Sequence, residues 1–227
     1  MNTSYHYKNK TIQIIIPDQP ADLPIVYVHL PAAASQDLYH TCKQHDFILV
    51  TIEGNDWNKD FSPWPSPRVF KQGEDFSGEA HIYLKELCEG LIPDLEERFD
   101  LHPHQRILAG YSLSGLFAYY ALLHTDLFTG ALCASASFWY PDFIDYALSH
   151  PFASSLQALY FSLGDKEKHA RGLMGQVEEN TQKLFEHVQE QNIKTCFVLN
   201  AGGHFQEATE RIAKGIDWLL TKKGATQ

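Results

Sequence analysis

The sequence predicts an α/β fold, with a mostly parallel central sheet that helices cover on both faces and no separate lid domain. Short apolar runs rich in β-branched and aromatic residues indicate strands at residues 11–16, 25–30, 47–52, 107–109, 130–135, 156–163 and 195–199. Longer amphipathic segments lie between most of these runs, and strands that alternate with helices form parallel sheets. Most runs have no polar face, which is typical of strands that are buried on both sides.

The chain of 227 residues carries a formal net charge of −10. This length fits a single α/β domain over residues 1–227. The negative charge argues against nucleic acid or an anionic membrane surface as the main partner. No apolar stretch reaches the roughly 18 residues that span a bilayer, and the N-terminus lacks the apolar core of a signal peptide. We therefore expect a cytoplasmic protein.

The four cysteines (Cys42, Cys88, Cys133 and Cys196) are far apart, and none belongs to a C-x-x-C pair. Each lies in an apolar or helical stretch. Buried free thiols are therefore expected, rather than disulfides or a zinc site.

In the first half of the chain, prolines and a serine mark where elements begin and end. Pro17 ends the first strand, and Ser35 is predicted to cap a helix that continues to about His45. Residues 53–74 form a long irregular segment, and loops of that length are usually functional. Residues 75–99 predict a helix with one apolar side, which Pro93 is placed to kink.

In the second half of the chain, helices are predicted at residues 141–150, 176–189 and 205–220. The last of them is amphipathic and closes the fold.

One motif organises the rest of the chain: Gly110-Tyr-Ser112-Leu-Ser114-Gly115, between the strand at 107–109 and an apolar helix. Strand, small-residue turn and helix together are typical of the nucleophile elbow of the α/β-hydrolase fold. The turn is tight, so the residues two positions from the serine must be small. Gly110 meets this condition, and Ser114 stands where a second glycine is usual. We predict that Ser112 is a nucleophile; the alternative is a turn with an incidental serine.

A serine hydroxyl is a weak nucleophile until a base accepts its proton, and histidine suits that task near neutral pH. Of the twelve histidines, His204 follows the last predicted strand within a Gly-Gly-His loop. The glycines give this loop the freedom to direct the ring toward Ser112. His204 is therefore the predicted base.

The base needs a carboxylate partner, which in α/β hydrolases lies between the serine and the histidine along the chain. Two candidates follow the strand at 156–163. Glu167 is favoured because it lies on the loop beyond the strand and has the longer side chain; Asp165 is the alternative acid and is closer to the turn. Asp142 is a remote third.

Acyl transfer also requires N–H donors for the oxyanion. The residue after the nucleophile, Leu113, should supply one. The other should come from the loop after the strand at 25–30, where Pro31 has no N–H. Leu30 or Ala32 is therefore the second candidate.

Aromatic and polar residues near the predicted carboxyl edge of the sheet are the candidates for substrate binding: Trp57, Trp64, Arg68, Trp139, Tyr111 and His29. Phe61 and Phe70 lie in the same long loop as the first three. These aromatic rings either line a pocket for an aryl or bulky apolar acyl group, or hold the loop down. If the rings line a pocket, Arg68 would be placed to meet a phenolate or carboxylate on the acyl group. Both interpretations remain open at the level of sequence.

The elbow Gly-Tyr-Ser-Leu-Ser-Gly-Leu-Phe-Ala resembles the putative esterase family of α/β hydrolases, which holds esterase D, enterochelin-type siderophore esterases and mycolyltransferases. Tyr160-Phe-Ser-Leu-Gly-Asp-Lys-Glu167, Gly202-Gly-His-Phe205 and the Trp57…Pro63-Trp64-Pro65 loop resemble the small siderophore-esterase-like branch most. The likeness extends over about residues 10–220. It implies a serine hydrolase without metal or cofactor that uses Ser112, His204 and an acid.

Two features depart from the family pattern. Ser114 replaces the usual second glycine of the elbow, and Tyr27-Val-His-Leu-Pro31 replaces the Asp-Gly that often ends the strand predicted at residues 25–30.

The leading expectation is hydrolysis of a small-molecule carboxylic ester through an acyl-enzyme. A thioesterase is the close alternative, and an acyltransferase is the next. From another class, a catalytically silent binding protein on the same scaffold is possible.

Overall fold

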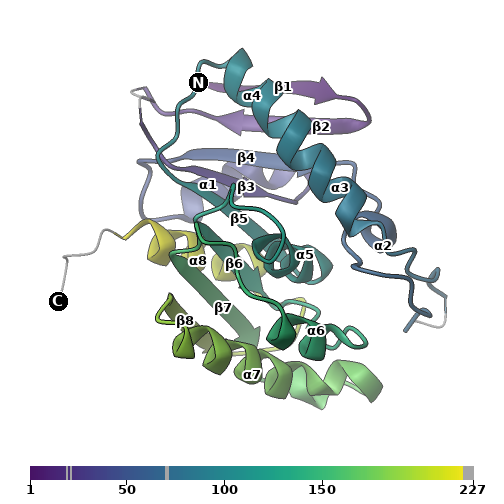
Figure 1. Ribbon diagram of the computed structural model, residues 1–227. Coiled ribbons are helices and arrows are strands. Elements are labelled where there is room, and N and C mark those ends of the chain that lie inside the picture. Colours follow the sequence, from purple (N-terminus) through teal and green to yellow (C-terminus); the bar gives the residue numbers. More distant parts are fainter. Residues whose placement is uncertain (19, 21, 70–71, 222–227) are drawn as a thin grey trace.

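The structure, a computed structural model, contains an eight-stranded sheet with the strand order β1-β2-β4-β3-β5-β6-β7-β8 (Figure 1). It describes residues 1–18, 20, 22–69 and 72–221. The strands are β1 (Asn2–Tyr7), β2 (Lys10–Ile15), β3 (Ile25–Val28), β4 (Ile48–Glu53), β5 (Arg106–Tyr111), β6 (Gly130–Ala134), β7 (Ala158–Gly164) and β8 (Lys194–Asn200). Every predicted strand is present within a few residues of its expected bounds.

The first two strands run antiparallel to their neighbours, and the six others are parallel to one another. β1 pairs with β2, and β2 pairs with β4, both in antiparallel register. The sequence analysis did not predict β1. Its side chains alternate between exposed and half-buried positions, so this edge strand lacks the apolar run that identifies the central strands.

Two hydrophobic cores lie on opposite faces of the sheet, because alternate side chains of a strand point in opposite directions. On β5, Leu108 belongs to one core, whereas Ile107 and Ala109 belong to the other. The first core is covered by α3 (Ala80–Glu86), α4 (Ile92–Arg98), α5 (Leu113–Leu122), α6 (Phe143–Ser149) and α7 (Val177–Glu190). The second is covered by α1 (Ser35–Thr41) and α8 (Ala208–Leu220). This arrangement is the α/β-hydrolase fold.

Two helices of the first half differ from their predicted forms. Ser35 does not cap α1: it follows the short turn η1 (Ala32–Ala34), and its hydroxyl bonds with that of Thr51. The helix predicted at 75–99 begins only at α3 and passes through a π-helical turn, η2 (Leu87–Leu91), before α4. Pro93 has no N–H to donate to the carbonyl four residues earlier, so the wider turn before it accommodates the gap in the helix.

The parallel strands place the ends of β5, β6, β7 and β8 at one edge of the sheet, and the loops that leave this edge carry Ser112, Ser135, Glu167 and His204. The long segment after β4 also starts there. It contains the short helix α2 (Trp57–Asp60) and an isolated bridge between Ser66 and Phe76. This edge is therefore where the site is assembled.

All four cysteines are free thiols: Cys42 and Cys133 are buried, and Cys88 and Cys196 are half-buried. Among the described residues, no helix combines the length and apolarity needed to cross a membrane.

Candidate active site

Ser112 occupies the turn between β5 and α5, with φ of 59° and ψ of −123°. Residues with a side chain rarely adopt a positive φ, and such strain often marks functional sites. A Cβ at Gly110 would lie 2.0 Å from the carbonyl oxygen of Ser114. The turn is so tight that only glycine fits at position 110, as the motif predicts.

The Ser114 side chain explains why serine is tolerated in place of the second glycine. Its hydroxyl accepts a hydrogen bond from the Tyr111 N–H and donates one to the Tyr111 carbonyl, both at 2.9 Å. The close approach on this side occurs instead at Gly115, where a Cβ would lie 2.9 Å from the Ala136 Cβ. Ser114 therefore ties the elbow together, and Gly115 provides the space.

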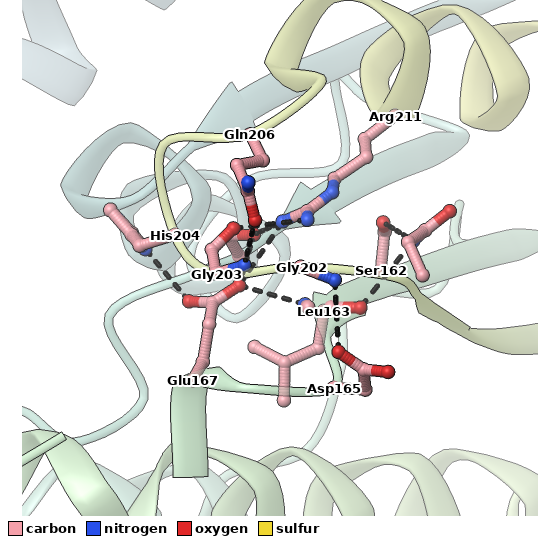
Figure 2. A network of polar contacts seen from close by, with 12 residues as sticks. Ser162, Leu163, Asp165, Glu167, Gly202, Gly203, His204, Gln206 and Arg211 are labelled. Atoms are coloured by element: carbon pink, nitrogen blue, oxygen red, sulfur yellow. Dashed lines mark hydrogen bonds and ion pairs between the residues drawn. The ribbon is translucent and has the colours of Figure 1, made fainter. Parts of the chain in front are cut away.

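Ser112, His204 and Glu167 form a continuous chain of hydrogen bonds. The distance from Ser112 Oγ to His204 Nε2 is 3.1 Å, and the distance from His204 Nδ1 to Glu167 Oε2 is 2.7 Å. Figure 2 shows His204 above the Glu167 carboxylate. A carboxylate only accepts hydrogen bonds, so Nδ1 carries the hydrogen. Nε2 then faces the Ser112 hydroxyl.

The inner oxygen of Glu167, Oε1, is as well hydrogen-bonded as the outer oxygen, Oε2, which contacts His204. Oε1 accepts hydrogen bonds from the Ser135 hydroxyl at 2.7 Å and from the Gly164 N–H at 2.8 Å. Burial alone raises the pKa of Glu167, but the hydrogen bonds from His204, Gly164 and Ser135 outweigh it and hold the pKa below its ordinary value. The carboxyl group is therefore ionised at neutral pH.

The alternative acid, Asp165, has a different task. Its Oδ1 accepts the Gly202 N–H at 2.9 Å, and its own N–H donates to the Asn200 carbonyl at 2.8 Å. In Figure 2 this contact lies to the right of the Glu167 carboxylate, away from His204. Asp165 thus ties the loop after β8 to the loop after β7, and Glu167 is the carboxylate that contacts His204.

A cavity of about 600 Å³ opens in front of Ser112 and His204. Most of its wall is apolar, with side chains from the loop after α2, the loop after β6 and the segment before α7. The apolar lining residues include Phe76, Leu113, Trp139, Met174, Val177 and Phe205. Lys166, His169 and Asn58 add polar groups to the wall. The Ser112 hydroxyl, the His204 imidazole and an apolar pocket therefore meet at one point.

The family described as "Putative esterase" matches residues 26–206, which is most of the chain. The chain belongs to this family. The similarity extends to the protein YbbA of Bacillus subtilis (strain 168), described as uncharacterized, at 22% identity over 190 residues, 80% of this chain and 76% of YbbA.

Two solved structures share the fold of this esterase-family chain. The siderophore hydrolase EstB from Aspergillus nidulans superposes with a TM-score of 0.78 at 18% identity, over 100% of this chain and 97% of EstB. The enterobactin and salmochelin hydrolase IroE superposes with a TM-score of 0.64 at 15% identity, over 96% and 92% of the two chains.

Of the aromatic residues predicted to bind substrate, Trp139 lines the cavity of this esterase-family chain, whereas the two loop tryptophans do not. The Trp64 indole N–H donates to the Pro141 carbonyl at 3.1 Å, and its ring contacts Tyr140, Phe143 and Tyr146. Trp57 is 41% exposed and rests edge-on against Phe61. The loop tryptophans therefore hold the long loop down. Phe70 lies outside the described residues.

Arg68 and Tyr111 also contact the protein itself. The Arg68 guanidinium donates to the Gly73 carbonyl of its own loop at 3.2 Å. The Tyr111 hydroxyl donates to the His204 carbonyl, and its ring lies against the His204 ring. Neither residue lines the cavity; Tyr111 instead supports the loop that carries His204.

His29 belongs to the core rather than to the cavity. It is buried, and its Nε2 lies 2.7 Å from the Tyr83 hydroxyl, with Phe61 and Phe117 against the ring. Burial, together with the charge of Lys10, lowers the pKa of His29 to about 3. This ring is neutral at physiological pH and does not line the cavity.

The predicted oxyanion donors differ in whether their N–H group already has a hydrogen-bond partner. Leu113 is the first residue of α5, so its N–H has no partner within the helix, and the residue lines the cavity. The Ala32 N–H donates to Glu53 Oε2 at 3.1 Å, which makes Ala32 the weaker of the two loop candidates. Leu30 packs against the second core and remains a prediction.

Sequence reasoning missed Arg211, whose side chain is fully buried beside Glu167. A signal was available: Arg211 lies one and two helical turns before Gly215 and Leu219, on the apolar face of the closing helix. It also missed Ser135, which follows β6 at the carboxyl edge with φ of 41°.

Proposed function

We propose that this protein is a serine hydrolase that cleaves a carboxylic ester through an acyl-enzyme. The observation that carries the proposal is the hydrogen-bonded chain from Ser112 Oγ through His204 to Glu167, located at the wall of an apolar cavity. Membership of the esterase family supports hydrolysis of an ester bond.

In the proposed reaction, Ser112 Oγ attacks the ester carbonyl carbon while its proton passes to His204 Nε2. The carbonyl oxygen becomes an oxyanion, which the Leu113 N–H stabilises together with a second donor. When the intermediate collapses, the alcohol leaves with the proton from His204 and the acyl group stays on Ser112. A water molecule then repeats the sequence, with His204 as base, and releases the acid. Glu167 stabilises the imidazolium in both halves.

The proposed substrate is an ester with an aryl or siderophore-type acyl group. Phe76 and Trp139 supply flat aromatic surface in the wall of the cavity, and Lys166 and His169 supply groups that suit an anionic substituent. This chain shares the fold of EstB, which is described as a siderophore hydrolase, and of IroE, which is described as an enterobactin and salmochelin hydrolase. The chain as a whole is acidic, so a cationic side chain in the cavity wall, Lys166, stands out from the overall charge.

Fluorophosphonate labelling of the purified protein, combined with a panel of esters and thioesters with and without iron-loaded siderophores, tests the proposal. Labelling and ester turnover would support it. Faster turnover of thioesters would indicate a thioesterase, and transfer to an added alcohol would indicate an acyltransferase. Absence of both labelling and turnover would identify a silent scaffold and refute the proposal.

Trp139→Ala and Trp64→Ala should have different effects, because only Trp139 lines the cavity. Trp139→Ala is expected to lower kcat/KM for aryl esters relative to acetate esters by roughly two- to tenfold, the equivalent of about 0.5–1.5 kcal/mol for an aromatic pair. Trp64→Ala should lower the Tm and affect both substrates alike. Steady-state kinetics and thermal unfolding of the two variants measure this, and a preserved aryl preference in Trp139→Ala would exclude stacking on this ring.

Lys166→Met should weaken the binding of anionic substrates. An exposed charge contributes little, so KM for an ester with a carboxylate on its acyl group should rise by up to roughly fivefold, and KM for the matched neutral ester should not change. Lys168→Met is the control, because the Lys168 ammonium pairs with Glu178 at 3.2 Å. The rise in KM for the anionic ester relative to the neutral ester should shrink at high salt. Equal changes in KM for both esters would exclude a charge effect.

A further inference from the structure

Arg211 is the largest side chain that is fully buried among the described residues. It belongs to α8, the closing helix, and extends from there toward Gly203 and Glu167 (Figure 2). A Cβ at Gly164 would lie 2.9 Å from one terminal nitrogen of its guanidinium. The missing side chain of Gly164 therefore makes room for the buried charge. Buried charges are rare unless they are paired, so the partners of Arg211 indicate its purpose.

One arm of the guanidinium meets the carboxylate that contacts His204. Nη1 donates to Glu167 Oε1 at 3.2 Å, to the Ser135 hydroxyl at 3.0 Å and to the Tyr111 hydroxyl at 3.3 Å. Ser135 in turn donates to Glu167 Oε1. The guanidinium therefore contacts the inner oxygen of Glu167, while the outer oxygen holds His204.

The other arm holds the segment from which His204 projects. Nη2 donates to the Ala201 carbonyl at 3.3 Å and to the Gly203 carbonyl at 3.0 Å. The Tyr111 hydroxyl, which accepts from the first arm, donates to the His204 carbonyl. The three carbonyls of this short loop are thus fixed directly or through Tyr111 to one side chain. Figure 2 shows the guanidinium beside Gly203, above the Glu167 carboxylate.

We propose that Arg211 is a positioning residue, which holds the inner oxygen of Glu167 and fixes the loop that carries His204, so that acid and base stay in register. This inference deepens the proposed function and rests on it. A planar fork with five N–H donors suits the task, because it can serve a carboxylate and backbone carbonyls at once. A lysine can supply the charge but not both arms.

The charged and titratable groups around Glu167 come from four segments. Three of them are distant in the sequence: α8 with Arg211, the loop after β8 with His204, and β5 with Tyr111. The fourth is the segment of Glu167 itself, with Asp165, Lys166 and Lys168. Asp165 accepts the Gly202 N–H, and Lys168 pairs with Glu178. Lys166 lines the cavity. Among the described residues, Arg211 is the one permanent cation that forms an ion pair with the Glu167 carboxylate. Its loss should favour the protonated carboxyl group.

Three variants test the inference: Arg211→Met, which removes charge and fork; Arg211→Lys, which keeps the charge; and Arg106→Met as a matched control. Arg106 forms an ion pair with Glu96 at 2.6 Å. It starts β5, at the opposite edge of the sheet from Ser112. The readouts are the pH dependence of kcat/KM, kcat and KM separately, the Tm, and the ¹³C NMR titration of the Glu167 side-chain carboxyl.

Arg211→Met should lower kcat by on the order of 10²-fold with little change in KM, because the reacting groups lose alignment. The acidic limb of kcat/KM and the Glu167 carboxyl titration should both move to higher pH by about one unit. Arg211→Lys should leave both pH midpoints near those of the wild type but still lower kcat, since the two loop carbonyls lose their donor. Arg106→Met should lower the Tm and leave the pH profile unchanged.

A fall in Tm with unchanged kcat and pH midpoints in Arg211→Met would overturn the inference and leave Arg211 a purely structural residue. If Arg211→Met does not fold, wild-type kcat in Arg211→Lys would overturn it equally. If the wild type hydrolyses no ester and is not labelled, the proposed function fails, whereas the NMR titration of Glu167 still tests the effect of Arg211.

Discussion

Ser112→Ala is expected to abolish fluorophosphonate labelling and to lower kcat by on the order of 10³-fold or more. Ser112 Oγ is the hydroxyl that lies 3.1 Å from His204 Nε2, and the base can activate only a group within its reach. The substitution exchanges a hydroxyl for a hydrogen in a strained turn and should leave the Tm nearly unchanged. Mass spectrometry of the labelled protein and steady-state kinetics measure the two effects.

The control is Ser114→Ala. The Ser114 hydroxyl is buried and bonds with the Tyr111 backbone, so it is not available to attack a substrate. Its loss leaves a buried N–H without a partner, which should cost about 1–3 kcal/mol of stability, but labelling should persist at Ser112. Labelling of Ser114 in the Ser112→Ala variant would contradict the assignment.

The features predicted from sequence are those that local chemistry constrains. A strand, a turn of small residues and a helix can be recognised within a dozen positions, so the elbow and the parallel sheet were predicted correctly. Glu167 was favoured over Asp165 because of its reach, and the structure brings Glu167 to His204. Asp165 is engaged by the Gly202 N–H, a backbone contact that no sequence pattern reveals.

The features that sequence did not predict depend on which way a side chain turns. Trp64 and Trp139 both lie in loops near the carboxyl edge, but Trp64 has a partner for its N–H in Pro141, whereas Trp139 faces the cavity. His29 follows a strand that leads toward the site, yet its ring turns to the Tyr83 hydroxyl in the core. These directions are set by tertiary packing, and composition does not reveal them.

Long-range ion pairs are equally invisible in the sequence. Arg211 and Glu167 are 44 positions apart, and a single arginine in an amphipathic helix normally faces solvent. Its position on the apolar face was the available signal, and only the fold shows that Gly164 leaves space for it.

Glu167→Gln is expected to lower kcat by on the order of 10⁴-fold. A glutamine keeps the size of the side chain, and its carbonyl oxygen can still accept from Ser135, the Gly164 N–H and Arg211. The amide NH₂ group then faces His204 Nδ1, which must become the acceptor. The ring hydrogen moves to Nε2, where it opposes the Ser112 hydroxyl, so the base is in the wrong tautomer.

The pH dependence of the wild type follows from the same carboxylate. The pKa of Glu167 is held below its ordinary value. The hydrogen bond from the ionised Glu167 to His204 is therefore complete when the pH is above the ordinary pKa of a glutamate, and is lost only as the pH falls through the lowered pKa.

Asp165→Asn is the matched control for Glu167→Gln. An asparagine oxygen still accepts the Gly202 N–H, so kcat should stay within a few-fold of wild type and the effect should be confined to stability. Kinetics and thermal unfolding of both variants decide the roles. A larger loss of kcat in Asp165→Asn, with the fold intact, would make Asp165 the functional acid.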